Sequence, residues 1–530
     1  MARLVFHRFV AAALCFVTIA LPASARAEWW EAESDHFIVK ARASEKDARE
    51  YALELERFDR ALRILQGMPV EEAVGRANKP TIYRFGQPAH IARIYGASGS
   101  GVTGFFISRA GDTVAFAPTR SAAEPIKSAH RTRSDVELDP RSVLFHEYTH
   151  YFMMQHFPGA YPRWYVEGFA EMLATMRVAD DGSYHIGDPP QYRAHQIFQL
   201  NDFALDRMLD PDYRLRGIDA LQHYATGWLL THYLSFNTER LAQLRAYLRA
   251  IAEGQDGLEV ARREFGDLDQ LEAELRKYKN GPFPGIGLKT SAPEPIVQMR
   301  ELTKAEEDAI DAEMQLARGV EDAAEGRRIA SDVEKVIARH GDDPKLLALL
   351  AEAQIDARQF AEAEATGEKI VSLDPSSVDG WLARAAAADG LVSEDAAQAA
   401  QVRAYATKAA ALDRSDPRPL ILYYRSYIAT GEEVPELAVQ ALETAYEFAG
   451  SDGGYRLLVA RQMLVDGKFD IAHQVLMPIA FQGHKTAEPR DEDDPSLTRL
   501  LALVNEGNRD AGIQMIDRMI DMSENEDAAY

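Results

Sequence analysis

Residues 143–153 of the chain read VLFHEYTHYFM and contain two histidines and a glutamate in the pattern HExxH. Asp139-Pro140, just before this stretch, is typical of a helix N-terminus, because aspartate accepts hydrogen bonds from the first free amides and proline suits the first helical position. A helix that starts there places His146 and His150 one turn apart on the same face. Two imidazoles at that spacing can bind one zinc ion from one side.

Glu147 projects about 100° around the same helix from the first histidine. Its carboxylate lies near the metal and can take a proton from the attacking water, then deliver it to a leaving amine. The rest of the helix is apolar almost all round, from Val143 to Met154. Because histidines and a glutamate on so buried an element are costly without partners, the pattern favours a metal site over histidines that are hydrogen-bonded inside a core.

A third ligand is available in residues 162–171, which read PRWYVEGFAE. A second helix that begins near Pro162 and runs antiparallel to the first can bring Glu167 to the metal. Glu171 lies one turn further along the same face. It is placed to hold a ligand histidine by its other ring nitrogen.

HExxH followed by W-x-x-E-G-F-A resembles the gluzincin (peptidase MA-like) zinc metallopeptidases, the broad class that contains thermolysin and aminopeptidase N. The resemblance covers about residues 100–240. It implies that Glu167 is the third zinc ligand and that Glu171 supports a ligand. The 16 residues between His150 and Glu167 are slightly fewer than in the best-known members, so we expect the loop over residues 157–161 to be tight.

His156 is an alternative third ligand, because it lies six residues after His150, where metzincins place their third histidine. Those enzymes need a glycine midway that turns the chain back towards the metal. Met153 stands there in this sequence, inside a run that favours continued helix. The sequence therefore favours Glu167 over His156.

A transition-state donor is expected on a helix over residues 218–234. Its segment Tyr224-Ala225-Thr226-Gly227 is similar to the Tyr-x-x-Gly segment of aminopeptidase N relatives, in which the tyrosine hydroxyl stabilises the oxyanion. Tyr224 is the candidate, His223 is the substitute, and a buried structural tyrosine is the alternative interpretation. The Gly-x-Met-Glu-Asn segment with which those aminopeptidases recognise a free amino terminus does not occur in the sequence.

The surrounding chain predicts an α+β catalytic unit followed by an all-α domain. Its expected parts are an N-terminal α/β sheet lobe (28–138), a zincin-like helical lobe (139–280), a Pro/Gly linker (281–295) and tetratricopeptide-like repeats (296–530). In the first lobe, strands over 104–108 and 113–116 form a predicted hairpin whose edge strand can pair with an extended peptide. Residues 120–139 are polar and irregular, a candidate flap.

The last region carries a degenerate repeat. Ala363, Ala397, Ala438 and Ala472 occupy matching places, with steps of 34, 41 and 34 residues. This resembles a tetratricopeptide array, whose unit is 34 residues, although Arg358 stands where that family favours glycine and the longer step implies an insertion. The alternative is an irregular helical bundle. Stacked helix pairs usually offer a concave surface, so we expect a protein partner or a polypeptide substrate there.

Residues 1–27 have the layout of a secretory signal peptide, with Arg3 and Arg8, an apolar run over 9–21 and small residues at the end. Cleavage is expected after Ala27 or alternatively after Ala25, and an uncleaved anchor is the remaining alternative. The single cysteine lies inside this segment, so the mature chain would have no disulfide. We therefore expect an exported protein, periplasmic or secreted.

Charge and hydropathy exclude other classes. The chain has a formal net charge of -24, so it has no general attraction to phosphate backbones or anionic lipid, and nucleic-acid binding is disfavoured. No later stretch reaches ~18 apolar residues, so no transmembrane segment is expected after cleavage.

Together these patterns predict an exported zinc metallopeptidase. His146, His150 and Glu167 would bind zinc, Glu147 would act as base and acid, and Tyr224 would stabilise the oxyanion. The alternative is a catalytically silent zincin-like domain in a repeat-containing envelope scaffold protein, and a zinc enzyme that cuts a non-peptide bond also remains open. Hydrolysis needs the Glu147 carboxylate, whereas a binding role tolerates Glu147→Gln.

Overall fold

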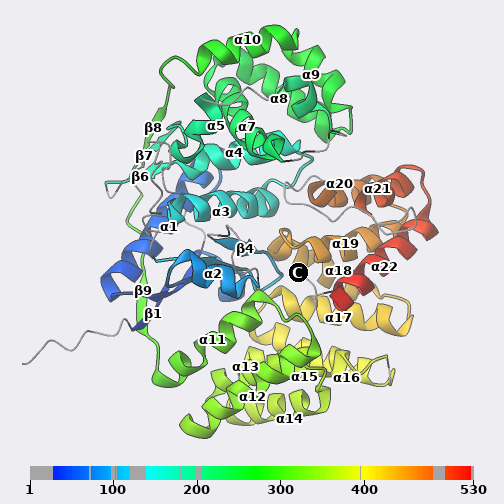
Figure 1. Cartoon of the computed structure of the whole chain (residues 1–530). Coiled ribbons are helices and arrows are strands. Elements are labelled where there is room, and N and C mark those ends of the chain that lie inside the picture. Colours follow the sequence, from blue (N-terminus) through cyan, green and yellow to red (C-terminus); the bar gives the residue numbers. More distant parts are fainter. Residues whose placement is uncertain are drawn as a thin grey trace, which may run out of the picture.

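The computed structural model describes residues 28–526 except 71–72, 97–101, 103, 120–138, 180, 199–203, 212, 214, 216, 291, 394 and 481–495. The expected signal peptide and all of the expected flap but Asp139 therefore lie outside the described residues. A mixed α+β region is followed by a long run of helices (Figure 1). Within the described ranges, every helix is too short or too polar to cross a membrane.

The N-terminal lobe is built on a six-stranded sheet of order β4-β5-β3-β2-β1-β9. Its strands are β1 (Trp29–Glu33), β2 (Ile38–Arg42), β3 (Thr81–Arg84), β4 (Phe105–Ile107), β5 (Val114–Ala117) and β9 (Gln298–Glu301). β2, β3 and β5 run parallel to one another, and the other neighbours are antiparallel. The predicted β4–β5 hairpin is confirmed, and β4 lies at the edge of the sheet.

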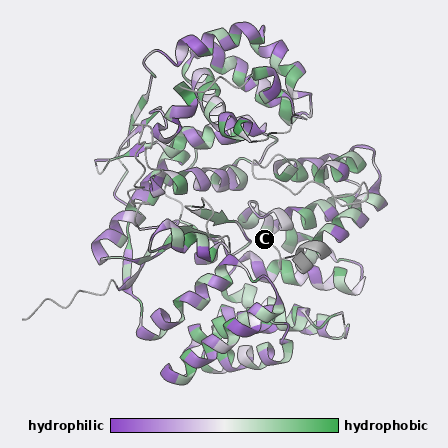
Figure 2. Ribbon diagram, in the orientation of Figure 1, coloured by the Kyte–Doolittle hydropathy of each residue, from purple (hydrophilic) through white to green (hydrophobic). Residues whose placement is uncertain are grey.

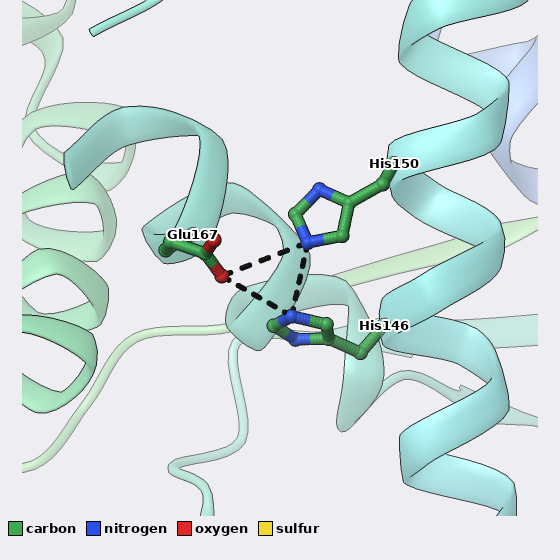
Figure 3. A group of neighbouring side chains, drawn as sticks. All are labelled: His146, His150 and Glu167. Carbon is green, nitrogen blue, oxygen red and sulfur yellow. Dashed lines mark hydrogen bonds and ion pairs between the residues drawn. The ribbon is translucent and has the colours of Figure 1, made fainter. Parts of the chain in front are cut away.

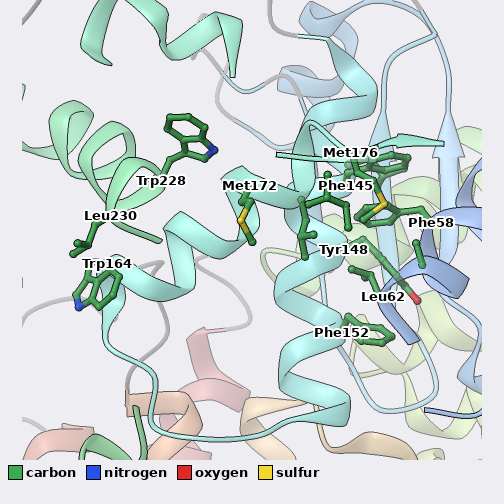
Figure 4. Close-up of a cluster of buried hydrophobic side chains, with 14 of the residues drawn as sticks. Phe58, Leu62, Phe145, Tyr148, Phe152, Trp164, Met172, Met176, Trp228 and Leu230 are labelled. Atoms are coloured by element: carbon green, nitrogen blue, oxygen red, sulfur yellow. The ribbon is translucent and has the colours of Figure 1, made fainter. Parts of the chain in front are cut away.

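Helix α1 (Glu45–Gln66) packs on β1 and β2, and the short helix α2 (Pro88–Ile94) lies beside β5. Ser44 begins α1 by accepting a hydrogen bond from the Asp47 amide, and Gly67 ends it at φ 68°. The ring of Phe58 stacks on that of Phe145, with 3.8 Å between their centroids (Figure 4). Phe145 belongs to the helix that begins at Pro140, so this stacking joins the N-terminal lobe to the helix that carries the HExxH pattern.

The helical lobe is centred on α3 (Pro140–His156), α4 (Arg163–Ala174) and α7 (Ile218–Phe236), and α4 packs against both others. Five further helices complete it: α5 (Ala194–Phe198), α6 (Leu205–Leu209), α8 (Thr238–Ala252), α9 (Gly257–Phe265) and α10 (Leu268–Tyr278). A small antiparallel sheet joins β6 (Arg177–Val178), β7 (Ser183–Ile186) and β8 (Ile286–Lys289). The predicted Pro/Gly linker over 281–295 thus contains a strand.

The C-terminal region is a stack of helix pairs. Its helices are α11 (Lys304–Arg318), α12 (Ala323–His340), α13 (Pro344–Asp356), α14 (Phe360–Leu373), α15 (Val378–Asp389), α16 (Gln398–Leu412), α17 (Pro417–Thr430), α18 (Glu436–Ala449), α19 (Gly453–Val465), α20 (Phe469–Ala480), α21 (Leu497–Asn505) and α22 (Arg509–Glu526). From α11 to α18 each helix packs on the next. The alternate helices α11, α13, α15 and α17 also form a row in which each packs on the following one. Apolar and polar residues alternate along these helices, as expected where one side is buried (Figure 2).

The repeat alanines are placed as predicted in three of four units. Ala363, Ala438 and Ala472 are fully buried in α14, α18 and α20. Ala397 is an exposed residue at the N-cap of α16, and Ala399 is buried there instead. The predicted spacing is therefore wrong at this unit, because Ala397 precedes Gln398, the first residue of α16.

Candidate metal centre

Helix α3 holds the two histidines of the HExxH pattern. Asp139 accepts a hydrogen bond from the Arg141 amide at its N-terminus and Pro140 is its first residue, so the helix begins where the sequence predicted. His146 and His150 extend from one face of α3 towards Glu167 of α4 (Figure 3). The helix continues through His156.

Three ligand atoms form a small triangle. Nε2 of His146 lies 3.0 Å from Nε2 of His150, and Oε2 of Glu167 lies 3.3 Å from the first nitrogen and 3.6 Å from the second. Bonds of about 2.0–2.1 Å to a tetrahedral zinc ion separate neighbouring ligand atoms by about 3.3 Å. The triangle therefore already has the size that a single zinc ion requires.

The burial of Glu167 also fits a metal. Its side chain is 0% exposed, and neither carboxylate oxygen has a hydrogen bond of good geometry to any described residue. A buried carboxylate is costly unless positive charge or hydrogen-bond donors compensate it. Its nearest polar neighbours are the two imidazole nitrogens, which are themselves metal ligands.

The charges of the three side chains shift one another's pKa values. Burial opposes the charge of Glu167, but the neighbouring His150 and His146 outweigh burial and hold the pKa of this carboxyl well below its usual range. Burial likewise opposes the charge of His146, yet the contact with Glu167 and the charges of Glu171 and Glu147 raise its pKa to about 9. The imidazoles and the carboxylate therefore attract one another electrostatically.

Two glycines explain how α4 approaches α7 so closely. A Cβ atom on Gly168 would lie 2.3 Å from the carbonyl oxygen of Gly227, and one on Gly227 would lie 2.8 Å from the carbonyl oxygen of Trp164. Gly168, which directly follows Glu167, and Gly227, the last residue of the Tyr224–Gly227 segment, therefore meet at one helix crossing. This crossing sets the position of Glu167 opposite α3.

Tyr224 lies on α7 beside the triangle, with its ring centroid 6.5 Å from that of His146. Burial, then the charge of Glu167, raise the pKa of the Tyr224 hydroxyl, so it stays protonated and can donate a hydrogen bond. Burial lowers the pKa of His223 to about 4, so this imidazole is neutral at pH 7. Tyr224 therefore meets the chemical requirement for the predicted donor.

Glu171 is buried, and its carboxylate accepts hydrogen bonds from the side chains of Tyr192 (2.6 Å) and Arg193 (3.0 and 2.7 Å). The carboxylate therefore acts on His146 through its charge, while its own hydrogen bonds go elsewhere. Sequence reasoning did not identify Tyr192 and Arg193. They form part of a short 3-10 turn after two prolines, and no pattern in that segment connects it with the HExxH helix.

His156 does not join the metal-ligating group found among the described residues, which comprises His146, His150 and Glu167. It lies at the end of α3, where its ring packs against Phe152 at 4.7 Å between centroids. Burial lowers its pKa to about 4. The geometry thus favours the glutamate as third ligand over this histidine.

No family model matches the chain, and no curated protein matches it. Among solved structures, it is similar to a thermophilic TPR protein from Thermus thermophilus, with 17% sequence identity and a TM-score of 0.31. The match covers 38% of this chain and 99% of that chain. The metal centre is argued from the geometry of the chain's own residues.

Proposed function

We propose that this chain is an exported zinc-dependent metallopeptidase of the gluzincin type. The observation that carries the proposal is the triangle of His146, His150 and Glu167, which has the dimensions of a zinc site and a buried carboxylate that needs a cation. The HExxH pattern supplies Glu147 beside it. Glu147 and His150 line the same cavity, so a substrate in that cavity meets both.

Zinc, when bound, supplies Lewis acidity towards a carbonyl group and an activated water at neutral pH. Glu147 takes the proton of the attacking water and passes it to the leaving amine. Tyr224 donates its hydroxyl hydrogen to the oxyanion that develops on the carbonyl. The deep burial of Glu167 keeps its carboxylate free of competing water.

The edge strand β4 is proposed to bind the substrate as an added strand. β4 pairs with β5 on one side only, and Phe106 and Ile107 line the cavity together with Glu147. An extended polypeptide that pairs with this edge would run past the catalytic glutamate. A peptide affinity unchanged by Ile107→Pro would contradict this placement.

The repeats support a second candidate function, a catalytically silent scaffold in which the metal stabilises a peptide-binding module. Stacked helix pairs such as α11–α18 commonly bind polypeptides. Glu147 separates the two functions, because hydrolysis requires its carboxylate whereas peptide binding does not.

The decisive experiment measures metal content and peptide-library cleavage for the purified mature chain and three variants. We expect one zinc per native chain, its loss in His146→Ala and its retention in Glu147→Gln. His156→Ala, on the same helix but outside the triangle, is the matched control and should keep both zinc and cleavage. Cleavage abolished by Glu147→Gln establishes the peptidase, zinc without cleavage of any peptide favours the scaffold, and a native chain without metal overturns both assignments.

A further inference from the structure

A cavity of about 390 Å³ lies beside the HExxH helix and is lined by residues from two parts of the chain that are far apart in the sequence. One side is formed by α3, β4 and the loop to α4, and includes Glu147 and His150. The opposite side is formed by Ser451, just before the N-cap of α19, Gly453, the first residue of α19, and Pro478 of α20. Figure 1 shows these two repeat helices beside α3. The repeats therefore contribute residues to the same cavity as the proposed catalytic glutamate.

Several hydrogen bonds fix α19 against the catalytic unit. Ser108, after β4, donates to the hydroxyl of Ser451 at 2.7 Å, and the amide of Ala110 donates to Oδ2 of Asp452 at 2.8 Å. The same Asp452 caps the N-terminus of α19 by accepting a hydrogen bond from the amide of Tyr455. The wall formed by α19 is thus part of the folded unit.

The C-terminal end of α3 is held by the same region. Gln155 accepts a hydrogen bond from the Ser451 amide at 3.0 Å, and Arg456 donates to the carbonyl oxygen of Met154 at 3.1 Å. Arg456 is itself fully buried. Polar contacts therefore hold the start of α19 against both the residues after β4 and the C-terminal end of α3.

The cavity wall is mainly apolar. Its side chains include Met153, Met154, Phe157 and Val166, and Glu147 is the one acidic residue among its described lining, which contains no lysine or arginine. A charged or strongly polar side chain would lose its hydration there without a partner, whereas an apolar side chain would gain by burial. The volume lies within the usual range of ligand pockets, about 300–1,000 Å³.

We propose that α19 and α20 form the far wall of the substrate cleft and that this cavity receives a large apolar side chain of a polypeptide, such as leucine or phenylalanine. The proposal rests on the proposed peptidase function and adds its substrate class. In this arrangement the repeats select the substrate at the reaction site itself. Side chains next to the reacting carbonyl enter the space between the HExxH helix and the last repeats.

Two adjacent glycines offer a matched pair of variants. Gly453 lines the cavity, and a Cβ atom there would meet only Ile479 Cγ2 within 4 Å, at 3.4 Å, so a side chain can be added at this position. Gly454 is exposed, and its Cβ would meet only Asp452 Oδ1, at 3.5 Å. Both lie in the first turn of α19, so a phenylalanine at either position disturbs the helix N-terminus to a similar extent.

The test uses the full mature chain with zinc and a series of amino-acid hydroxamates with glycine, alanine, leucine or phenylalanine side chains, whose binding is measured by calorimetry. The native chain should bind the leucine and phenylalanine compounds roughly 10- to 100-fold more tightly than the glycine compound. Gly453→Phe should remove this preference while the zinc content stays that of the native chain. Gly454→Phe should retain the preference, and Gly453→Leu replaces Gly453→Phe if that variant does not fold.

The outcomes separate the two proposals. A preference that persists in Gly453→Phe, or that is lost equally in Gly454→Phe, overturns the role of α19. Equal binding of all four compounds by the zinc-loaded native chain overturns the apolar pocket alone. A native chain that binds neither zinc nor any hydroxamate overturns the proposed function and the pocket with it.

Discussion

The guanidinium of Arg193 lies over the ring of Tyr224, with 4.9 Å between the guanidinium carbon and the ring centroid. The same guanidinium donates two hydrogen bonds to Glu171, which is buried. A cation that is held by an ion pair and faces an aromatic ring restricts the orientation of that ring. Arg193 is therefore a positioning residue for the proposed oxyanion donor.

This relationship predicts non-additive kinetics. Tyr224→Phe should lower kcat by roughly 100-fold because it removes one oxyanion donor. Arg193→Ala should lower kcat by roughly tenfold, and the double variant should be no slower than Tyr224→Phe alone, because the arginine acts through the tyrosine. Steady-state kinetics on a library-derived peptide measure the cycle, with zinc content checked in each variant.

Arg207→Ala is the control for that cycle, because this exposed arginine faces the ring of Tyr213 at 5.9 Å. It should leave kcat unchanged. Additive losses in the double variant would contradict a positioning role and would indicate that Arg193 contacts the substrate directly.

The crossing of α4 and α7 predicts that Gly168→Ala weakens the metal site. The added methyl group would lie 2.3 Å from the carbonyl oxygen of Gly227, so the two helices must separate. We expect a loss of about 1–3 kcal/mol in the free energy of unfolding. Zinc affinity should fall as well, because Glu167 moves with α4. Chemical denaturation and zinc titration measure the two effects, and Gly454→Ala serves as the control, because its Cβ would make only an ordinary contact, 3.5 Å from Asp452 Oδ1.

A buried ion pair behind α3 predicts a pH dependence of stability. Nδ1 of His36 lies 2.9 Å from Glu56, with Asp59 and Arg63 also nearby. Burial opposes the charge of His36, but the hydrogen bond to Glu56 and the charge of Asp59 outweigh burial and Arg63 and raise its pKa above 6.5. The stabilisation from protonated His36 is therefore fully present below pH 6.5 and is lost as pH rises through the raised folded-state pKa.

Glu56→Gln should reduce this effect, because the glutamine carries no charge to stabilise the imidazolium. Melting temperatures from pH 6 to pH 9 should fall less steeply in the variant than in the native chain. Glu50→Gln, an exposed change on the same helix, should leave the slope unaltered. Parallel slopes in the native chain and Glu56→Gln would contradict the assignment.

The turn between α13 and α14 predicts a stabilising substitution. Arg358, between α13 and α14, has φ 58°, a left-handed conformation that the equivalent Gly467 adopts at φ 72°. Arg358→Gly should raise the free energy of unfolding by about 0.5–1 kcal/mol, because the steric strain of a side chain at this φ exceeds the added entropy of glycine in the unfolded chain. Gly467→Arg should lower it by about the same amount. Denaturant titrations measure both, and a destabilised Arg358→Gly would show that the arginine side chain contributes more than the backbone strain costs.

Local signals explain which features the sequence could predict. Asp139-Pro140 defines the start of α3, the HExxH spacing places two histidines on one face, and the EG dipeptide at Glu167 marks the crossing helix. The β4–β5 hairpin follows from a glycine turn between two apolar runs. Each of these depends on residues within one or two turns of one another.

The features that sequence reasoning missed depend on distant contacts. Arg193 lies in an irregular segment and donates a hydrogen bond to Glu171. Gly453 lines the cavity because the last repeats pack against α3. Neither residue has a local pattern that identifies its partner. The sequence could therefore identify the three residues that could hold a metal ion, but it could not identify the residues packed around them.

The order of strands in the large sheet has a consequence for folding during synthesis. β1 is the first strand of the described chain, yet one of its two neighbours is β9, which is made only after the whole helical lobe. Until β9 arrives, one side of β1 presents unpaired amide and carbonyl groups that can template pairing with another chain. A chain that stops at residue 280 would contain every proposed zinc ligand and still leave that edge open. The helical lobe is therefore inserted between two neighbouring strands of one sheet, and the sheet reaches its six strands only when the chain has been made through Glu301.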